Sequence, residues 1–224
     1  MAIFCDKEYP KESKYNNIFN SYNFELSAFQ KYAIEAIIEG NHILVTAHTG
    51  SGKTLPAEFA IRHYIEQGKK VIYTSPIKAL SNQKYYEFSK DYEDITFGLL
   101  TGDIKSNPEA QVLIMTTEIL RNTLFQKKVI SEKDSNKDNI LSFDMDIDKE
   151  LGCVIFDEIH YINDAERGKV WEETIMMLPN HIQMVMLSAT LDKPERFGDW
   201  IEKNKGKKVV ISSTTDRVVP LKHY

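Results

Sequence analysis

Short apolar runs alternate with helical patterns along most of this chain. The apolar runs are rich in Val, Ile and Leu, which is typical of strands that are buried on both faces. The predicted strands are residues 42–46, 70–74, 96–100, 111–115, 152–156, 183–187 and 208–212. The predicted helices are residues 27–39, 53–67, 77–92, 117–125, 168–178 and 194–205. This alternation predicts right-handed βαβ units and an α/β fold, in which a mostly parallel sheet has helices on both faces.

Two segments do not follow this pattern. Residues 1–21 mix polar and aromatic side chains and are predicted to form an extended lead-in. Residues 127–150 are dense in charge and have no clear period. A long segment of this kind inside a compact domain is usually functional or disordered, and we expect a charged, mobile insertion at about residues 127–145. Residues 22–224 are otherwise predicted to form one domain.

Composition narrows the class of protein. Hydrophobic residues make up 42% and charged residues 27% of the chain, which is ordinary for a globular protein. No apolar run approaches the ~20 residues of a membrane span, and the N-terminal sequence has no secretory pattern. The two cysteines, Cys5 and Cys153, lie far apart, and Cys153 is interpreted as a small buried residue rather than a nucleophile or a disulfide partner. We expect an intracellular protein with no membrane partner, in either the cytoplasm or the nucleus.

The charge balance bears on nucleic acid as a partner. The net charge is −5 at pH 7. This value argues against a broad basic surface that coats nucleic acid, because such surfaces carry an excess of Lys and Arg. It still permits a local cationic groove.

A glycine-rich loop follows the predicted strand at residues 42–46. The segment AHTGSGKT matches the phosphate-loop pattern of strand, glycine turn and helix, except that an alanine replaces the first glycine. Its glycines allow backbone N–H groups to surround phosphate oxygens, and the helix that starts near Lys53 directs its positive end to the same place. Lys53 is expected to bind the β- and γ-phosphates and Thr54 to ligate Mg²⁺, whereas the alternative is a glycine-rich turn with an incidental Lys-Thr pair. The loop consists of Ala47, His48, Thr49, Gly50, Ser51, Gly52, Lys53 and Thr54.

An acidic pair follows another predicted strand, in the segment VIFDEIH. We expect Asp157 to hold Mg²⁺ through its water shell and Glu158 to polarise the attacking water. An Asp-Glu pair alone is weak, because solvated carboxylates are common in loops. Combined with the phosphate loop on one sheet it predicts phosphoryl transfer, which needs mainly positioning and charge neutralisation. Both segments follow the carboxyl ends of strands, where open sheets bind ligands.

These motifs together resemble a known family. The phosphate loop, DEIH at residues 157–160 and SAT at residues 188–190 are similar to the first RecA-like domain of a superfamily 2 DExH-box helicase. Further stretches resemble the superkiller and exosome-cofactor RNA helicases: TSPIKALSNQKY (74–85), TGD (101–103), LIMTTEILR (113–121), ERGKVWEE (166–173) and TTDRVVPLKHY (214–224). The resemblance covers roughly residues 22–224, apart from the insertion. It implies a RecA-like phosphate-loop NTPase that uses ATP and Mg²⁺ and acts on single-stranded RNA.

The resemblance also implies roles for single residues. Gln30 bonds the adenine base and Phe24 is a candidate stacking partner, although Phe24 and Phe29 are equally well interpreted as core residues. His160 has a catalytic role that couples hydrolysis to the segment Ser188, Ala189 and Thr190, and its alternative is a structural histidine. The implied RNA contacts are Pro76, Lys78, Gln83, Gly102, Asp103, Thr116, Thr117, Glu118 and Arg121.

Two of the implied RNA contacts have alternatives. Lys78 by itself is an ordinary surface lysine. Arg121 could instead form an ion pair with a carboxylate in its own helix. Both therefore depend on the family context for the RNA interpretation.

The chain has fewer domains than the family that it resembles. A second RecA-like domain and further helical elements are expected in such enzymes, and the chain ends at Tyr224, where the second domain would begin. We therefore expect a fragment of a larger ATP-dependent RNA helicase whose partners include that second domain and an RNA-decay complex. The alternatives are a DNA helicase of a related DExH branch and a stand-alone ATP-binding interaction module that does not hydrolyse ATP.

Overall fold

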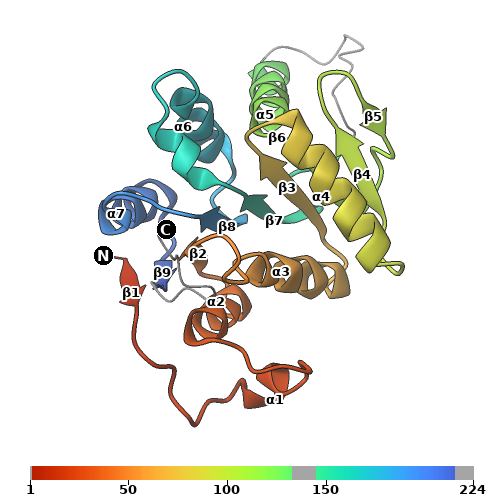
Figure 1. The fold of residues 1–224 in the computed structure, drawn as a ribbon. Coiled ribbons are helices and arrows are strands. Elements are labelled where there is room, and N and C mark those ends of the chain that lie inside the picture. The colour runs from red at the N-terminus through yellow and green to blue at the C-terminus, as the bar shows by residue number, and fades with distance from the viewer. Residues whose placement is uncertain (1, 133–144, 215–224) are drawn as a thin grey trace, which may run out of the picture. The chain divides into compact units, whose positions relative to one another are not determined.

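The computed structural model describes residues 2–132 and 145–214. The chain forms two compact units, which are shown in Figure 1. Unit 1 comprises Met1–Ala60 and Gln183–Tyr224, and unit 2 comprises Ile61–Ile182. The boundary falls within helix α3 (Leu55–Glu66).

Unit 1 is built on four parallel strands in the order β1-β9-β2-β8. Helix α2 contacts β2 and β9, and α7 contacts β9 from the opposite face (Figure 1). All residues of β2 and β8 are buried, as their Val, Ile, Leu and Met content predicts. The elements are β1 (Ile3–Cys5), α1 (Asn16–Phe19), α2 (Ala28–Ile38), β2 (His42–Thr46), β8 (Gln183–Ser188), α7 (Pro194–Lys205) and β9 (Val209–Ser213).

Unit 2 is built on strands in the order β7-β3-β6-β4-β5, all parallel except for β5, which is antiparallel to β4. Helix α4 covers one face, and α5 and α6 lie on the other (Figure 1). The elements are β3 (Lys70–Ser75), α4 (Lys78–Asp91), β4 (Phe97–Leu100), β5 (Lys105–Ser106), β6 (Val112–Thr116), α5 (Thr117–Glu132), β7 (Leu151–Phe156), the 3-10 helix η1 (Ile159–Asn163) and α6 (Gly168–Met177).

The predicted α/β class with mostly parallel strands and helices on both faces is confirmed. Every predicted strand is present, and its ends lie within one residue of the prediction. The elements that were not predicted are short: β1, α1, β5 and η1. They have too few residues to show a period in the sequence.

Two helices differ from the prediction. Helix α3 begins at Leu55 and not at Lys53, because Lys53 and Thr54 form a turn and Pro56, whose fixed φ suits a first helical turn, follows directly. Helix α5 continues to Glu132 and so includes the first residues of the predicted insertion. Its added residues are mainly Gln, Lys and Glu, which favour helix even without an apolar stripe. The rest of the predicted insertion lies mostly outside the described residues.

The N-terminal segment of unit 1 packs against helix α2. Tyr15 and Phe19 are buried in one cluster with Leu26 and Ile34. The ring of Tyr9 lies edge-on to that of Phe19, with 5.3 Å between ring centroids. These aromatic side chains have no regular spacing, and therefore the sequence predicted an extended lead-in where the structure has β1, α1 and a small core.

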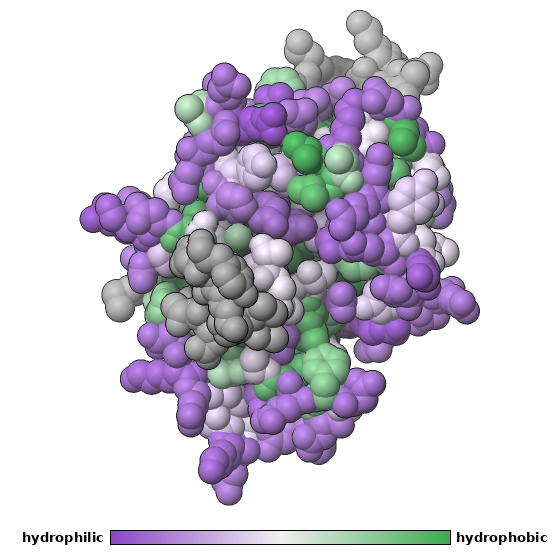
Figure 2. Space-filling model, in the orientation of Figure 1, coloured by the Kyte–Doolittle hydropathy of each residue, from purple (hydrophilic) through white to green (hydrophobic). Residues whose placement is uncertain are grey.

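The visible surface is mainly polar, with apolar side chains in small separate groups (Figure 2). Across residues 2–132 and 145–214, no helix combines the length and the apolar composition that a membrane crossing requires.

Candidate functional site

The predicted phosphate loop follows β2 in unit 1. Gly50 and Gly52 have φ angles of 83° and 84°, a region that residues with a Cβ rarely adopt. Lys53 is only 9% exposed, and Thr54 is half-buried immediately before α3. Strand, glycine turn and helix are thus present in the predicted order. The binding of phosphate by these residues stays a prediction.

The other residues of the loop bond to its own backbone and to the predicted coupling segment. Ser51 donates from its N–H and its Oγ to the carbonyl of His48, at 3.1 and 2.6 Å. Ala47 donates its N–H to the carbonyl of Ser188 at 3.0 Å, and the Ser188 Oγ donates to the carbonyl of Thr190 at 3.1 Å. The structure therefore joins the phosphate loop to the coupling segment through backbone. The remaining members of the two motifs are half-buried or exposed: Thr49 and Ala189.

Gln30 lies beside the phosphate loop. Its side chain accepts a hydrogen bond from the N–H of Ser27 at 2.9 Å and donates to the carbonyl of Gly52 at 3.2 Å. Ser27 and Gln30 form a capping box at the start of α2, which satisfies two N–H groups that the helix leaves open. Helix capping alone thus places Gln30 against the loop, and its predicted contact with adenine is untested.

The two phenylalanines of the same segment differ in exposure. Phe29 is 4% exposed and belongs to the core, so its core interpretation holds. Phe24 is 52% exposed, and its ring lies edge-on to Tyr22 with 5.7 Å between centroids. Phe24 therefore presents a ring surface to solvent, as a stacking partner must.

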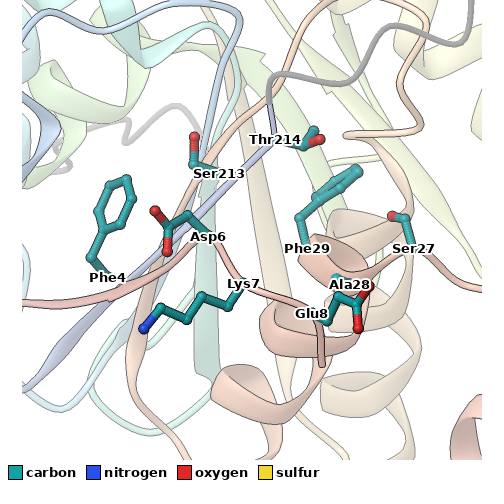
Figure 3. A pocket seen from close by; sticks show the side chains of 9 residues that line it. All are labelled: Phe4, Asp6, Lys7, Glu8, Ser27, Ala28, Phe29, Ser213 and Thr214. Atoms are coloured by element: carbon teal, nitrogen blue, oxygen red, sulfur yellow. The ribbon is translucent and has the colours of Figure 1, made fainter. Parts of the chain in front are cut away.

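A pocket of about 430 Å³ lies beside the start of α2 in unit 1 (Figure 3). It is lined by residues from β1 and the segment after it, from the first turn of α2 and from the end of β9. Its ionisable side chains are Asp6, Lys7 and Glu8, which have mixed sign. None of the predicted site residues lines it, so the pocket is separate from the predicted nucleotide contacts.

Asp157 follows β7 in unit 2 and is 6% exposed. Tyr73 of β3 donates its phenol hydrogen to Oδ2 of Asp157 at 2.7 Å, and the N–H of Glu158 donates to Oδ1 at 3.0 Å. Burial, together with the neighbouring Asp157 carboxylate, raises the pKa of Tyr73 well above its ordinary value, so the phenol keeps its proton. Tyr73 is not among the residues predicted from sequence. Its only sequence signal is a phenol inside an apolar strand.

Glu158 has a backbone conformation that is unusual for its residue type. Its φ of 54° and ψ of 46° place it in the left-handed region, immediately before η1. The Nδ1 atom of His160 lies 3.2 Å from Oε2 of Glu158, although without hydrogen-bond geometry. The structure thus brings His160 beside the carboxylate that is predicted to polarise water. The coupling role of His160 is untested.

The donor atoms present suit a magnesium ion. Carboxylate and hydroxyl oxygens are ligands that Mg²⁺ prefers, and this ion usually binds through one or two protein groups together with substrate phosphates. A carboxylate has about four lone pairs, so Asp157 can accept metal-bound water in addition to the bonds from Tyr73 and Glu158. Among the described residues, no group of three or more His, Cys, Asp or Glu side chains forms a metal site of its own. The hydroxyl of Thr54 and the carboxylate of Asp157 are therefore each a type of donor that fits the predicted ion.

Two of the predicted RNA segments meet at one sheet edge of unit 2. Ser75, at the end of β3, pairs in register with Thr116, at the end of β6. Pro76 follows Ser75 directly, and the Oγ1 of Thr117 donates to the carbonyl of Ser75 at 3.4 Å. Strand β6 continues into α5 without a loop, and Glu118 is exposed in the first turn of that helix.

Two further predicted RNA motifs are joined by an ion pair. Lys78, the first residue of α4, pairs with Asp103, and both side chains are exposed. A Cβ on Gly102 would lie 3.2 Å from the Nζ of Lys78, so this glycine permits the close approach. Gln83 is exposed on α4 and donates to Glu87 at 2.7 Å.

Arg121 also has a protein partner. It forms an ion pair with Glu173 at 3.0 Å, between half-buried side chains. A carboxylate partner was the alternative to RNA binding, but the partner lies on α6 and not in the helix of Arg121. The residue that sequence reasoning missed here is Glu173, because its pairing with Arg121 depends on how α5 and α6 pack.

Comparisons with known proteins agree with the motifs. A family model described as DEAD/DEAH box helicase matches residues 27–197. The antiviral helicase SKI2 of Saccharomyces cerevisiae is 44% identical over 205 residues, which is 92% of this chain and 15% of that protein. Superkiller complex protein 2 of Mus musculus is 46% identical over 201 residues, 90% of this chain and 15% of that protein. The exosome RNA helicase MTR4 of Mus musculus is 41% identical over 225 residues, 100% of this chain and 20% of that protein.

A solved structure is also similar. The DUF1998 helicase MrfA bound to DNA superposes with a TM-score of 0.66 at 19% identity, over 93% of this chain and 30% of that one. At this identity the likeness concerns the fold alone, and it agrees with a RecA-like domain. The chain spans 15% to 20% of the length of the three curated relatives.

Proposed function

Because the chain belongs to the DEAD/DEAH box helicase family, we propose that it acts as the ATP-binding motor domain of an ATP-dependent RNA helicase. The family resemblance inferred from the sequence motifs is confirmed by this match and by the superkiller and exosome helicases. The names of those relatives support RNA as the nucleic acid and a complex of the superkiller or exosome kind as the partner.

ATP is the proposed substrate, and the predicted site residues have separate roles in binding and hydrolysing it. Lys53 binds the β- and γ-phosphates as a point charge, and Thr54 and Asp157 hold Mg²⁺. When bound, Mg²⁺ supplies charge neutralisation on the phosphates. Glu158 accepts the proton of the attacking water and orients it. Gln30 and Phe24 bind the adenine base by hydrogen bonding and stacking.

The observation that best supports this proposal is the phosphate loop itself. Two glycines with positive φ precede a lysine that is 9% exposed, and this turn connects a buried strand to α3. A buried lysine is uncommon, because removing its charge from water costs free energy unless an anion or a hydrogen-bonding group compensates. Backbone N–H groups of a glycine turn and of a helix start are suited to bind an anion, and Lys53 supplies a cation directly after the two glycines.

The RNA strand is proposed to lie along the carboxyl ends of β3 and β6. Support comes from the register pairing of Ser75 with Thr116, which places Pro76 and Thr117 at one edge. Backbone and hydroxyl groups at strand ends and helix starts bind phosphates without reading sequence. Lys78 adds a cation from the start of α4.

A second RecA-like domain is proposed to act with this one. In phosphate-loop enzymes of related mechanism, an arginine from another element contributes ~10³–10⁵ to the rate. The 224-residue polypeptide by itself is therefore expected to bind nucleotide and to show little RNA-stimulated hydrolysis. Addition of the second domain is expected to restore hydrolysis.

The proposed roles are tested with Lys53→Ala and Glu158→Gln. Binding of a fluorescent ATP analogue to the 224-residue polypeptide should weaken about 30–100-fold in Lys53→Ala, because a charge-assisted contact with phosphate is lost. Binding should stay within about twofold in Glu158→Gln, since the amide keeps the shape of the side chain. In the two-domain protein, Glu158→Gln should reduce turnover by about 10²–10⁴.

Lys193→Ala is the matched control, since Lys193 is outside the predicted site. Equal loss of nucleotide binding in Lys53→Ala, Glu158→Gln and the control would contradict the division of roles. Competition between RNA and DNA oligonucleotides of one sequence tests the substrate. Equal affinity for both would remove the support for RNA over the DNA alternative.

A further inference from the structure

Tyr73, which is not among the predicted site residues, bonds directly to the side chain of Asp157. It is fully buried at the centre of β3, in register with Ile155 of β7. Its phenol donates to Oδ2 of Asp157 at 2.7 Å in a buried environment. Its ring packs edge-on to Phe88 of α4, with 5.4 Å between centroids. The ring is therefore fixed by packing, and the hydroxyl position is fixed with it.

Asp157 is held at two points by consecutive residues of β3. The carbonyl of Thr74 accepts the N–H of Asp157 at 2.9 Å, and Tyr73 bonds to its side chain. The Oγ1 of Thr74 also donates to the carbonyl of Ile155 at 3.1 Å, which ties β3 to β7 just before the acidic turn. Both the main chain and the side chain of Asp157 are thus hydrogen-bonded to β3. Because the main chain and one carboxylate oxygen are fixed, the side chain has little rotational freedom.

We propose that Tyr73 is a positioning residue, which fixes the carboxylate of Asp157 in the orientation that receives the Mg²⁺–nucleotide complex. This inference rests on the proposed function, because it assigns to Asp157 the metal-holding role. Groups that hydrogen-bond to a metal-binding side chain orient it and change metal affinity without touching the metal. Tyr73 donates to one oxygen while Glu158 N–H donates to the other, so the plane of the carboxylate is defined by two donors.

Strand β3 also connects Tyr73 to the residues that are predicted to bind RNA. Tyr73 lies three residues before Pro76, and the intervening Ser75 bonds to the helix α4 through Ser81 at 2.7 Å. Thr117 bonds to the Ser75 carbonyl. A displacement of the end of β3 by RNA would therefore act on the side chain that holds Asp157.

Tyr73→Phe removes the hydroxyl and keeps the ring. The measurement is the affinity of a fluorescent ATP analogue for the 224-residue polypeptide as Mg²⁺ is raised, starting from a solution without divalent ions. We expect the Mg²⁺ concentration at half-effect to rise about tenfold, with affinity in the absence of Mg²⁺ unchanged. A general loss of structure would weaken binding under both conditions, so this pattern separates positioning from a structural defect.

Tyr15→Phe is the matched control. Its hydroxyl also donates to a carboxylate, Glu39, at 3.0 Å, in unit 1, and neither residue is among the predicted site residues. The control should leave the Mg²⁺ dependence unchanged. Asp157→Asn provides the second background: there, Tyr73→Phe should have no further effect, because the carboxylate through which Tyr73 acts is gone.

The outcomes separate this inference from the proposed function. If the unaltered chain binds nucleotide with no Mg²⁺ dependence, or not at all, both the metal role of Asp157 and the inference are overturned. If the unaltered chain depends on Mg²⁺ and Tyr73→Phe has the same dependence, the inference alone is overturned. An added effect of Tyr73→Phe in the Asp157→Asn background also overturns it.

If Tyr73→Phe does not fold, the inference is tested by proton NMR of the unaltered chain. A buried phenol hydrogen bonded to a carboxylate exchanges slowly with water and gives an observable proton NMR signal. This signal should be present for Tyr73 and should shift when Mg²⁺ and nucleotide are added together. A rapidly exchanging proton, or a signal that Mg²⁺ and nucleotide leave in place, would contradict the inference.

Discussion

The phosphate loop and the acidic turn each follow a mostly buried strand, but they hold their backbone in different ways. The loop has positive φ at Gly50 and Gly52, where no Cβ opposes that conformation. The turn has positive φ at Glu158, which does have a Cβ. The loop bonds chiefly to backbone, whereas the carboxylate of Asp157 receives the buried phenol of Tyr73.

This difference indicates what each region does before a ligand arrives. Glycine gives the loop its shape without steric strain, so the loop can adjust to phosphate oxygens at the expense of conformational entropy. A residue such as Glu158 in the left-handed region costs about 1–2 kcal/mol and persists only where its surroundings impose it. We infer that the loop is the more adaptable of the two backbones, whereas the conformation of the acidic turn is set in advance.

Among substitutions in the two regions, Gly52→Ala in the phosphate loop is expected to cause the largest loss of stability. The alanine must adopt a φ of 84°, and its Cβ would lie 2.6 Å from Nε2 of Gln30. The strained backbone costs about 1–2 kcal/mol, and displacing the buried Gln30 amide costs about 1 kcal/mol in lost hydrogen bonds. We expect the free energy of unfolding, measured with urea, to fall by about 2–3 kcal/mol.

Gly50→Ala is its matched control. The φ of Gly50 is 83°, and nothing lies within 4 Å of the position of its Cβ. Only the backbone cost of about 1–2 kcal/mol applies. Equal losses of stability in the two alanine variants would show that the Gln30 side chain moves aside without cost. Gln30 would then not restrict the backbone of the loop.

Low pH is expected to reduce the free energy of unfolding through a histidine in the strand before the phosphate loop. The strand before the acidic turn has no group that would act in this way. Burial and, to a smaller extent, Lys207 and Lys205 lower the pKa of His42, the first residue of β2, to about 3. Strand β7 has no ionisable side chain except Cys153. The unfolded chain binds a proton at this histidine below its usual pKa of about 6.5, so stability is complete above that value and declines as pH falls towards 3.

The expected loss is about 2 kcal/mol in the free energy of unfolding between pH 8 and pH 5, from this group alone. His42→Asn is the comparison, because its side-chain oxygen can replace Nδ1 as the acceptor of the Met184 N–H, a bond of 3.0 Å, and it does not titrate. The variant should have a smaller loss over the same range in urea unfolding. Parallel pH profiles of the two proteins would show that His42 is not the source.

The smallest expected effect concerns the acidic turn. Glu158→Gly should increase the free energy of unfolding by about 1 kcal/mol relative to Glu158→Ala, because glycine adopts a positive φ without the cost of a Cβ. Both substitutions remove the carboxylate, so the pair isolates the backbone term. Thermal or urea unfolding measures it, and a less stable glycine variant would mean that the turn is not strained at this residue.

The arrangement of strands was predictable because their side chains are buried on both faces. Such strands appear in the sequence as short Val, Ile and Leu runs, and every predicted run is a strand within one residue. The phosphate loop was predictable because its motif is contiguous. Helix α5 was predicted too short, since its Gln, Lys and Glu residues favour helix without producing an apolar stripe.

The long-range contacts of Asp157 in the acidic turn and of Arg121 in α5 were not predictable from sequence. Tyr73 and Asp157 are 84 residues apart, and Arg121 and Glu173 are 52 residues apart. Such pairs depend on strand register and helix packing, which no local pattern specifies. The left-handed conformation of Glu158 is likewise imposed by its surroundings, because glutamate by itself disfavours it.

The division of the chain into a continuous and a discontinuous unit has a consequence for its biosynthesis. Strand β2 pairs with β8 and β9, and the bond between Met184 and His42 spans 142 residues. At about 5–20 residues per second, a ribosome needs roughly 7–30 s to make that stretch. During that time β2 is an apolar strand without either of its partner strands, β8 and β9, whereas unit 2 is made without interruption. Nascent chains stalled before β8 should therefore recruit chaperones through β2.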